Sequence, residues 1–145
     1  MRIAVLNGPN LNLLGQREPE VYGRTSLAEI EAMVRDAARA LDAEIQWFQT
    51  NHEGAMVEAV QGLKGQADGA LINAAALTHS SLALRDALLA VRVPFVELHL
   101  SNIFAREPER RHSVIADLAI GMISGFGAES YLLALQALMG RLRAT

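Results

Sequence analysis

The stretch MRIAVLNGPNLN, residues 1–12, sets the fold of this chain. Its apolar run, Ile3–Leu6, has the length and composition of a β-strand, and the polar residues that follow end the strand in a loop. A helix is predicted next, at Ser26–Leu41, where Ser26 and Glu29 have the spacing of a capping box. A strand, a loop and a helix in this order form the repeating unit of a parallel α/β sheet.

The same unit recurs along the chain, because short apolar runs alternate with longer amphipathic stretches. The later strands are predicted at Ile45–Phe48, Ala70–Ile72, Phe95–Leu98 and Ala119–Ile123, and the later helices at Ala55–Leu63, Leu82–Val91 and Glu129–Leu142. Five such units predict an α/β, flavodoxin-like three-layer sandwich. Its five-stranded parallel sheet has the order 2-1-3-4-5, with helices on both faces. Ligands of such sheets bind beyond the carboxyl ends of the strands, so we expect the site in those loops.

Composition narrows the class of protein. The chain has 145 residues and a net charge of −3, which indicate one domain over residues 1–145 and do not favour a nucleic-acid partner. No apolar run is long enough to cross a bilayer, and no signal-peptide pattern follows the first strand, so a cytoplasmic location is expected. Cysteine is absent, which excludes a disulfide framework, a thiolate nucleophile and a thiolate metal site.

The basic residues are unevenly divided between lysine and arginine. Lysine occurs once, at Lys64, in a stretch typical of a solvated helix end. Imine-forming catalysis needs a lysine desolvated in a pocket, so Lys64 is a poor candidate for it. Arginine occurs twelve times. Arginine binds carboxylates with two parallel hydrogen bonds, which favours an acidic substrate, although a general preference for arginine on surfaces also accounts for much of this bias.

The connection after the first strand is unusually long, at about 18 residues, where a typical βα loop has two to six. It carries Asn10, Arg17 and Tyr22. Long loops in compact domains are often lids or binding loops, and glycines near both ends would act as hinges. We therefore predict a lid at about residues 15–24.

The loops after the second and third strands allow a structural and a functional interpretation. Asn51 is predicted to cap the second helix, and His52 is interpreted as structural. After the third strand come Asn73 and His79, the latter placed at a helix N-terminus, where the neutral form of its ring is favoured. Thr78 or Ser80 is the candidate N-cap of that helix. His79 on its own fits a cap and a functional group equally well.

The loop after the fourth strand is the most polar. Glu97 and His99 lie two residues apart, so on a strand both side chains point to the same face. A carboxylate beside an imidazole fixes the tautomer of the ring, which suits a general acid. Arg106 and Arg110 follow, either on a solvated face or in contact with a substrate or a neighbouring subunit.

The predicted strand order brings these loops together in one cleft. The cleft lacks a carboxylate pair, a nucleophile elbow, a phosphate-binding loop and a third ligand near His79 and His99, so no metal and no cofactor are expected. Proton transfer by tyrosine and histidine remains. Two alternatives stay open at this point: a nucleotide- or flavin-binding module, and a receiver-type signalling domain. The first lacks phosphate-binding glycines and a stacking aromatic residue, and the second lacks the acidic residues after strands 1 and 3.

The chain closely resembles the type II 3-dehydroquinate dehydratases along its full length. The motifs that carry the resemblance are NGPNLNLLG (7–15), REP (17–19) with YG (22–23), QTNHEG (49–54), NAAALTHS (73–80), LRD (84–86), ELHLSN (97–102), ARE (105–107) and RRHS (110–113). Each motif is short, but together and in this order they are specific. The resemblance implies an enzyme that removes water from 3-dehydroquinate through an enolate, in the shikimate pathway of aromatic amino acid and chorismate biosynthesis.

The resemblance also implies a role for each site residue. Tyr22 is the base that takes the C2 proton, supported by Arg17. Asn10, through an ordered water, stabilises the enolate, and His99, oriented by Glu97, protonates the departing C1 hydroxyl. The implied substrate-binding residues are Asn73, Ser101 and backbone N–H groups near Asn102 for the carboxylate and the reacting hydroxyl, His79 and Arg110 for the ring hydroxyls, and Arg106 as a second arginine of the lid.

The implied assembly is a homododecamer built from trimers, in which Asp86 reaches the site of a neighbouring subunit. The implied partner is the small-molecule substrate, with no nucleic acid and no membrane. The resemblance implies no cofactor and no metal. The single lysine fits an enolate route better than an imine route.

Overall fold

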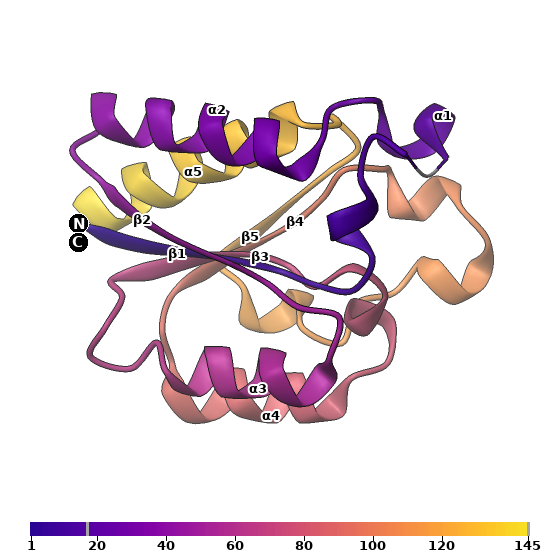
Figure 1. The fold of residues 1–145 in the computed structure, drawn as a ribbon. Helices are drawn as coiled ribbons and strands as arrows, with labels where there is room; N and C mark the ends of the chain where they lie inside the picture. Colours follow the sequence, from indigo (N-terminus) through magenta and orange to yellow (C-terminus); the bar gives the residue numbers. More distant parts are fainter. Residues whose placement is uncertain (17, 145) are drawn as a thin grey trace.

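The computed structural model, which describes residues 1–16 and 18–144, is built around one parallel β-sheet (Figure 1). Its strands are β1 (Arg2–Asn7), β2 (Glu44–Gln49), β3 (Gly69–Asn73), β4 (Phe95–His99) and β5 (Gly121–Ser124). All paired strands are parallel and the order is β2-β1-β3-β4-β5. The predicted order and fold class are therefore confirmed.

The helices form one layer on each face of the sheet. Figure 1 shows α2 (Leu27–Ala40) and α5 (Glu129–Arg143) on one face, and α3 (Glu53–Gln61) and α4 (Leu82–Val91) on the other. Alternate side chains of a strand point to opposite faces, and β1 divides its residues in this way. Its Ile3 and Val5 pack in the core under α2 and α5, while Ala4 and Leu6 pack in the core under α3 and α4.

Short segments connect these elements at the carboxyl end of the sheet. They are α1 (Pro19–Tyr22) and the 3₁₀ helices η1 (Leu11–Leu13), η2 (Ala75–His79), η3 (Ile103–Ala105), η4 (Pro108–Arg110) and η5 (Ala116–Leu118). The sequence analysis predicted none of them, because three to five residues are too few to show a helical period. Among the described residues, no helix combines the length and the apolar composition needed to cross a membrane.

The predicted start of α2 is confirmed. The Oγ of Ser26 accepts the backbone N–H of Glu29 at 3.2 Å, and the Glu29 carboxylate accepts the backbone N–H of Ser26 at 3.4 Å. This reciprocal pair satisfies two N–H groups that the first turn leaves without partners. The fifth strand differs from its prediction, because η5 occupies residues 116–118 and pairing of β5 with β4 begins at Gly121.

Two predicted helix caps are wrong. Asn51 does not cap α3, because its Oδ1 accepts the backbone N–H of Asn10 at 2.9 Å and the side-chain amide of Gln49 at 3.1 Å. His52 occupies the cap position without a side-chain bond. At α4 the cap is neither Thr78 nor Ser80 but Ser81, whose Oγ accepts the backbone N–H of Leu84 at 3.0 Å. In the first case, the side chain of Asn51 bonds a distant loop at Asn10 instead of capping its own helix.

The loop after β1 is fixed against the loop after β3 by a close backbone contact. The Gly8 N–H donates to the Asn73 carbonyl at 2.8 Å. A Cβ added at Gly8 would lie 2.4 Å from the carbonyl oxygen of Ala74 and 2.6 Å from its carbonyl carbon. Glycine is required here because no side chain fits between the two backbones.

Gly8→Ala is therefore expected to lower the free energy of unfolding by about 1–3 kcal/mol, because the backbone of Ala74 must move to admit the methyl group. Urea denaturation of the two proteins measures this difference. Gly54→Ala is the matched control, because its added Cβ meets no atom within 4 Å in the first turn of α3. It should leave stability unchanged or raise it by up to about 1 kcal/mol. Equal stability of both variants would contradict the steric argument.

Candidate active site

A pocket of about 590 Å³, part of it open to solvent, lies beyond the carboxyl ends of β1, β3 and β4. This is the place predicted from the strand order, because the connections from β1 and β3 leave the sheet toward opposite faces. Eight of the predicted site residues line it: Asn10, Tyr22, Asn73, His79, His99, Ser101, Arg106 and Arg110. Segments far apart in the sequence thus contribute to one cavity.

Three other predicted site residues do not line the pocket. Glu97 is fully buried behind His99 and does not line the pocket. Asn102 is exposed, and its Oδ1 accepts the backbone N–H of Phe104 at the start of η3. Asp86 is exposed on α4 and is absent from the pocket lining of its own chain. Arg17 lies outside the described residues.

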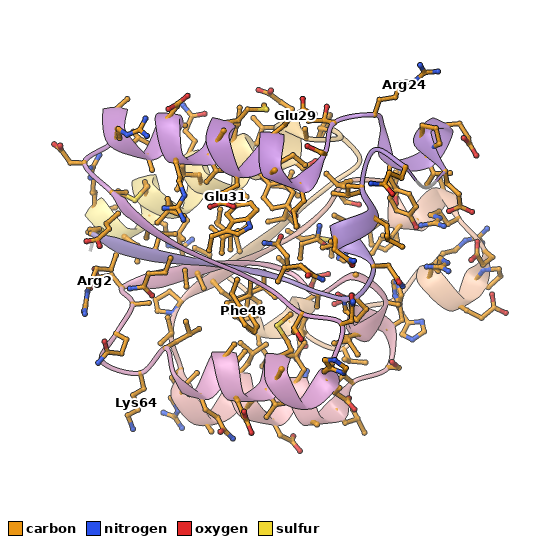
Figure 2. All side chains as sticks on the ribbon, viewed as in Figure 1. Arg2, Arg24, Glu29, Glu31, Phe48 and Lys64 are labelled. Carbon is orange, nitrogen blue, oxygen red and sulfur yellow. The ribbon has the colours of Figure 1, made fainter. Side chains whose placement is uncertain are left out.

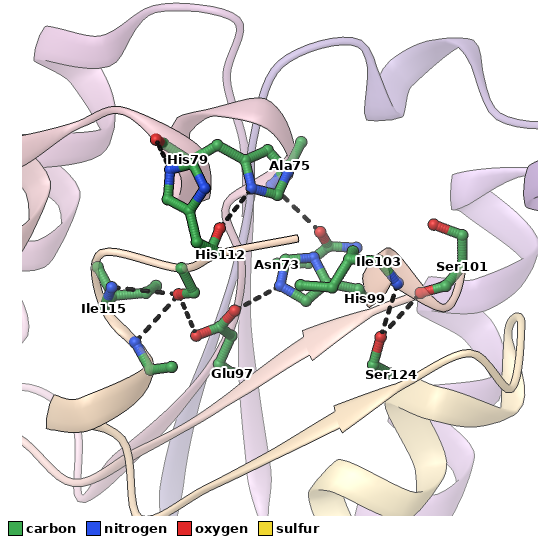
Figure 3. A network of polar contacts seen from close by, with 12 residues as sticks. Asn73, Ala75, His79, Glu97, His99, Ser101, Ile103, His112, Ile115 and Ser124 are labelled. Atoms are coloured by element: carbon green, nitrogen blue, oxygen red, sulfur yellow. Dashed lines mark hydrogen bonds and ion pairs between the residues drawn. The ribbon is translucent and has the colours of Figure 1, made fainter. Parts of the chain in front are cut away.

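Glu97 and His99 form a buried polar pair at the end of β4 (Figure 3). The Nε2 atom of His99 lies 2.5 Å from Oε2 of Glu97, and the two side chains are 5% and 0% exposed. The two side chains point to the same face of β4, as predicted, because alternate residues of a strand share a face. A buried carboxyl group needs further partners, and the sequence analysis did not identify one.

That partner is Ser113, whose Oγ donates to Oε1 of Glu97 at 2.7 Å. The direction of this bond follows from the other bonds of the hydroxyl. Its Oγ accepts the backbone N–H groups of Ile115 at 3.2 Å and Ala116 at 3.0 Å, which occupy both lone pairs. The one proton of Ser113 therefore points at Glu97. As a carboxylate, Glu97 then accepts from Nε2–H of His99, which leaves Nδ1 of that ring as the atom available to a ligand.

His79 is held by His112 through two bonds. Nδ1 of His79 lies 2.7 Å from the carbonyl oxygen of His112, and Nε2 of His112 lies 2.9 Å from the carbonyl oxygen of His79. A carbonyl oxygen only accepts, so His79 carries its proton on Nδ1 and keeps Nε2 as an acceptor in the neutral ring. The His79 ring also stacks on that of His99, with centroids 6.4 Å apart.

The pKa of His79 is lowered from its ordinary value of 6.5, chiefly by burial and less by the nearby positive groups of His99 and Arg110, while the bond to His112 opposes the shift. The predicted neutral form is thus supported, but the predicted cause is wrong. His79 is the last residue of η2 and precedes the Ser81 cap of α4, so it does not lie at the N-terminus of that helix.

Tyr22 reaches the pocket from the last residue of α1. Pro19 opens this single turn with its fixed φ, and Gly23 closes it at φ 86°, a conformation that favours glycine. Nη1 of Arg106 donates to the Tyr22 hydroxyl at 2.9 Å, and the guanidinium carbon lies 5.2 Å from the centroid of the ring. The Arg106 guanidinium therefore places a positive charge beside the phenolic oxygen. The sequence analysis gave this role to Arg17, so the contact from Arg106 is an addition.

The loop of Arg106 and Arg110 is braced by its own bonds. Nε of Arg111 donates to the Arg106 carbonyl at 2.6 Å, and Nε of Arg110 pairs with the carboxylate of Glu107. A backbone N–H bond of Glu107 and the Arg110 guanidinium hold the pKa of the Glu107 carboxyl below its ordinary value. These bonds hold the Arg110 guanidinium at the pocket and fix the backbone that carries Arg106.

A second tyrosine, Tyr131 of α5, lies behind the pocket and is fully buried. Burial raises the pKa of its hydroxyl far above the ordinary value. The sequence analysis predicted a helix at Glu129–Leu142 but did not identify this residue. The available signal was a tyrosine at helical spacing from Leu135 and Leu138, since the hydroxyl of a buried tyrosine needs a partner inside the fold. Among residues 1–16 and 18–144, no group of three potential ligands could hold a metal ion.

The state of His79 gives a pH-dependent prediction. Because its pKa is lower in the folded chain than in the unfolded chain, the unfolded chain takes up the proton first as the pH falls. The stability that neutral His79 contributes above its ordinary pKa is therefore lost as the pH falls through the folded value. Urea denaturation at neutral pH and at about pH 5 should show a smaller loss of stability for His79→Gln than for the unchanged protein. Equal losses would contradict the assignment.

Comparison with known proteins identifies the family. The model of the family described as "Dehydroquinase class II" matches residues 1–139. A protein named 3-dehydroquinate dehydratase from Synechococcus sp. (strain WH7803) is 56% identical over 143 residues, which cover 99% of this chain and 97% of the relative. One of the same name from Yersinia pestis (strain Pestoides F) is 53% identical over 140 residues, which cover 97% and 93%.

Solved structures agree with the sequences. The crystal structure of a type II dehydroquinase from Butyrivibrio crossotus DSM 2876 superimposes with a TM-score of 0.93 at 38% identity, covering 95% of this chain and 97% of that one. The type II dehydroquinase of Propionibacterium acnes superimposes with a TM-score of 0.91 at 39% identity, covering 96% of each chain. Together with the pocket at the carboxyl ends of its strands, these matches show that the chain belongs to the class II dehydroquinase family.

Proposed function

We propose that this chain is a 3-dehydroquinate dehydratase, a hydro-lyase of the shikimate pathway. It converts 3-dehydroquinate to 3-dehydroshikimate by anti elimination of water through an enolate. Family membership supports the reaction. The observation that carries the mechanism is that one pocket is lined by Tyr22, whose hydroxyl accepts a bond from Arg106, and by His99, which is backed by Glu97.

In this proposal Tyr22 is the base that removes the C2 proton. The chain has two tyrosines, and Tyr131 is fully buried outside the pocket lining, so Tyr22 is the tyrosine that reaches a substrate. A free phenol is a weak base near neutral pH because most of it is protonated. The bond from Arg106 stabilises the phenolate. We propose Arg17, five residues before Tyr22, as a second source of positive charge.

Loss of the C2 proton leaves an enolate whose negative charge needs support. We propose that Asn10 supplies it through an ordered water, as the family resemblance implies. Asn10 lines the pocket, and the bond from its backbone N–H to Asn51 fixes its loop at a φ of 69°. A donor that is already in position loses little reorganisation energy when the charge develops.

His99 is the proposed general acid. With Nε2–H given to Glu97, a proton on Nδ1 passes to the C1 oxygen as the C1–O bond breaks, and water leaves. The electron pair of the enolate forms the new C1–C2 double bond. Tyr22 ends protonated and His99 ends neutral, so one proton returns from tyrosine to histidine or to solvent before the next turnover.

The remaining polar groups bind the substrate in this proposal. Asn73 and Ser101, with backbone N–H groups near Asn102, hold the carboxylate and the reacting hydroxyl. His79 and Arg110 hold the ring hydroxyls, and His79 does so with Nε2 as an acceptor. Arg106 acts as a second arginine of the lid, which we place at about residues 15–24 and whose Tyr22 it contacts. We also propose that residues 1–145 form a single catalytic domain and that the lid closes over the substrate. A cytoplasmic location is part of the same proposal.

Turnover of 3-dehydroquinate, followed by the ultraviolet absorbance of the conjugated enone product, tests the function. The unchanged protein should give a steady rise. Tyr22→Phe should fold normally and lose about 10²- to 10⁴-fold in kcat, because it lacks the proton acceptor. Circular dichroism of both proteins is the folding control. Substantial turnover by Tyr22→Phe would remove the tyrosine from the mechanism, and no turnover by folded unchanged protein would contradict the function.

Borohydride separates the enolate route from an imine route. Lys64 is exposed and lies between α3 and β3, far from α1 in Figure 2. Borohydride added with substrate should therefore leave the enzyme active. A reduced adduct on Lys64 would overturn the enolate mechanism.

We further propose a homododecamer built from trimers, in which Asp86 contributes to the site of a neighbouring subunit. The support is its exposure on α4, outside the pocket of its own chain, while the adjacent Arg85 is held by Asp117. Sedimentation velocity should give the mass of twelve 15.7 kDa chains. Asp86→Ala should raise KM without changing the fold, because only the neighbouring pocket is altered. A single-chain mass with full activity would contradict this assembly.

A further inference from the structure

Tyr131 links the ends of the two central strands from behind the pocket. Its hydroxyl donates to Oδ1 of Asn7 at 2.6 Å and accepts from Nδ2 of Asn73 at 3.0 Å. Asn7 and Asn73 are the last residues of β1 and β3 and lie opposite each other in the sheet register. The Tyr131 side chain is 0% exposed, and its ring lies 5.9 Å from that of Trp47.

The directions of these bonds are fixed from one end. Nδ2 of Asn7 donates to the backbone carbonyl of Phe48 at 3.0 Å. A carbonyl oxygen cannot donate, so this bond fixes the amide nitrogen of Asn7 on that side and leaves Oδ1 facing Tyr131. Tyr131 must therefore donate its single proton to Asn7. Toward Asn73 it can only accept.

The other end gives the same orientation. Because Tyr131 can only accept there, Asn73 must present its amide nitrogen to the hydroxyl. Oδ1 of Asn73 then accepts the backbone N–H of Ala75 at 3.3 Å. The chain of bonds thus runs between two backbone groups whose polarity cannot be reversed, the Ala75 N–H and the Phe48 carbonyl. Each side-chain amide within it has one allowed orientation.

The orientation of Asn73 matters because Asn73 lines the pocket and Asn7 does not. An asparagine amide has two N–H groups. Tyr131 accepts one of them, and the other remains to donate to an oxygen of a ligand. A reversed amide would present its carbonyl oxygen to the same ligand atom and would repel a carboxylate.

We propose that Tyr131 is a positioning residue, whose hydroxyl, turned by Asn7, selects the orientation in which Asn73 donates to the substrate. This rests on the proposed function, in which Asn73 holds the substrate carboxylate and the reacting hydroxyl. A buried hydroxyl with two partners also stabilises the fold, so the test must separate binding from stability.

Tyr131→Phe removes one oxygen and keeps the ring beside Trp47. We expect kcat/KM for 3-dehydroquinate to fall about tenfold, mostly through a higher KM, the size expected for one misdirected hydrogen bond to a charged group. Leu138→Val is the matched control, because Leu138 is fully buried on the same helix and in the same core without a polar partner. It should lower the thermal midpoint and leave KM unchanged.

A double-mutant cycle identifies the route of the effect. In an Asn73→Ala background, Tyr131→Phe should cause no further change in KM, because the amide that it orients is gone. Asn7→Ala is a second, independent variant and should also raise KM, since it frees the Tyr131 proton to turn toward Asn73. This effect is expected even though Asn7 lies outside the pocket lining.

The outcomes separate this inference from the proposed function. No turnover by the unchanged, folded protein overturns both. Normal turnover by the unchanged protein with the same KM in Tyr131→Phe overturns the positioning role alone. An additive effect of Tyr131→Phe in the Asn73→Ala background also overturns it, as does an unchanged KM in Asn7→Ala.

Discussion

The parallel pairing of β1 with β3, in register to their last residues, is the constraint on which the site depends. At this point the strand order reverses, so the chain leaves β1 toward the face covered by α2 and leaves β3 toward the face covered by α4. The two departing loops open a crevice between them. The backbone contact of Gly8 with Asn73 and Ala74 fixes how far apart the loops begin.

The polar groups of the crevice are fixed by bonds that reach deep into the fold. Glu97, which accepts a bond from Ser113, orients His99, and His112 orients His79. Tyr22 differs, because it is carried by a four-residue helix and is held by Arg106, 84 residues away in the sequence. The proposed acid therefore belongs to a rigid strand, whereas the proposed base belongs to a connection whose position depends on another loop.

The sequence predicted the sheet order and the long helices because these depend on periodic burial over many residues. Leu82–Val91 was predicted to its exact bounds, and the capping box of Ser26 and Glu29 was recognised from spacing alone. Caps and contacts that depend on tertiary partners were beyond such reasoning. Asn51 bonds a loop 41 residues away instead of its own helix, and Arg106 reaches Tyr22 only after folding brings their loops together. Tyr131 was missed because apolar periodicity gives no information about where a hydroxyl points.

Trp47, on the edge strand β2, is the one tryptophan in the chain, and its half-buried indole lies against the Tyr131 ring. The protein thus carries its single tryptophan beside the hydrogen-bonded link between its two central strands. Emission from that indole comes from one environment, so its wavelength and intensity report on the docking of α5 against the sheet. Loss of that docking is visible optically in the unlabelled protein, without a contribution from any other tryptophan.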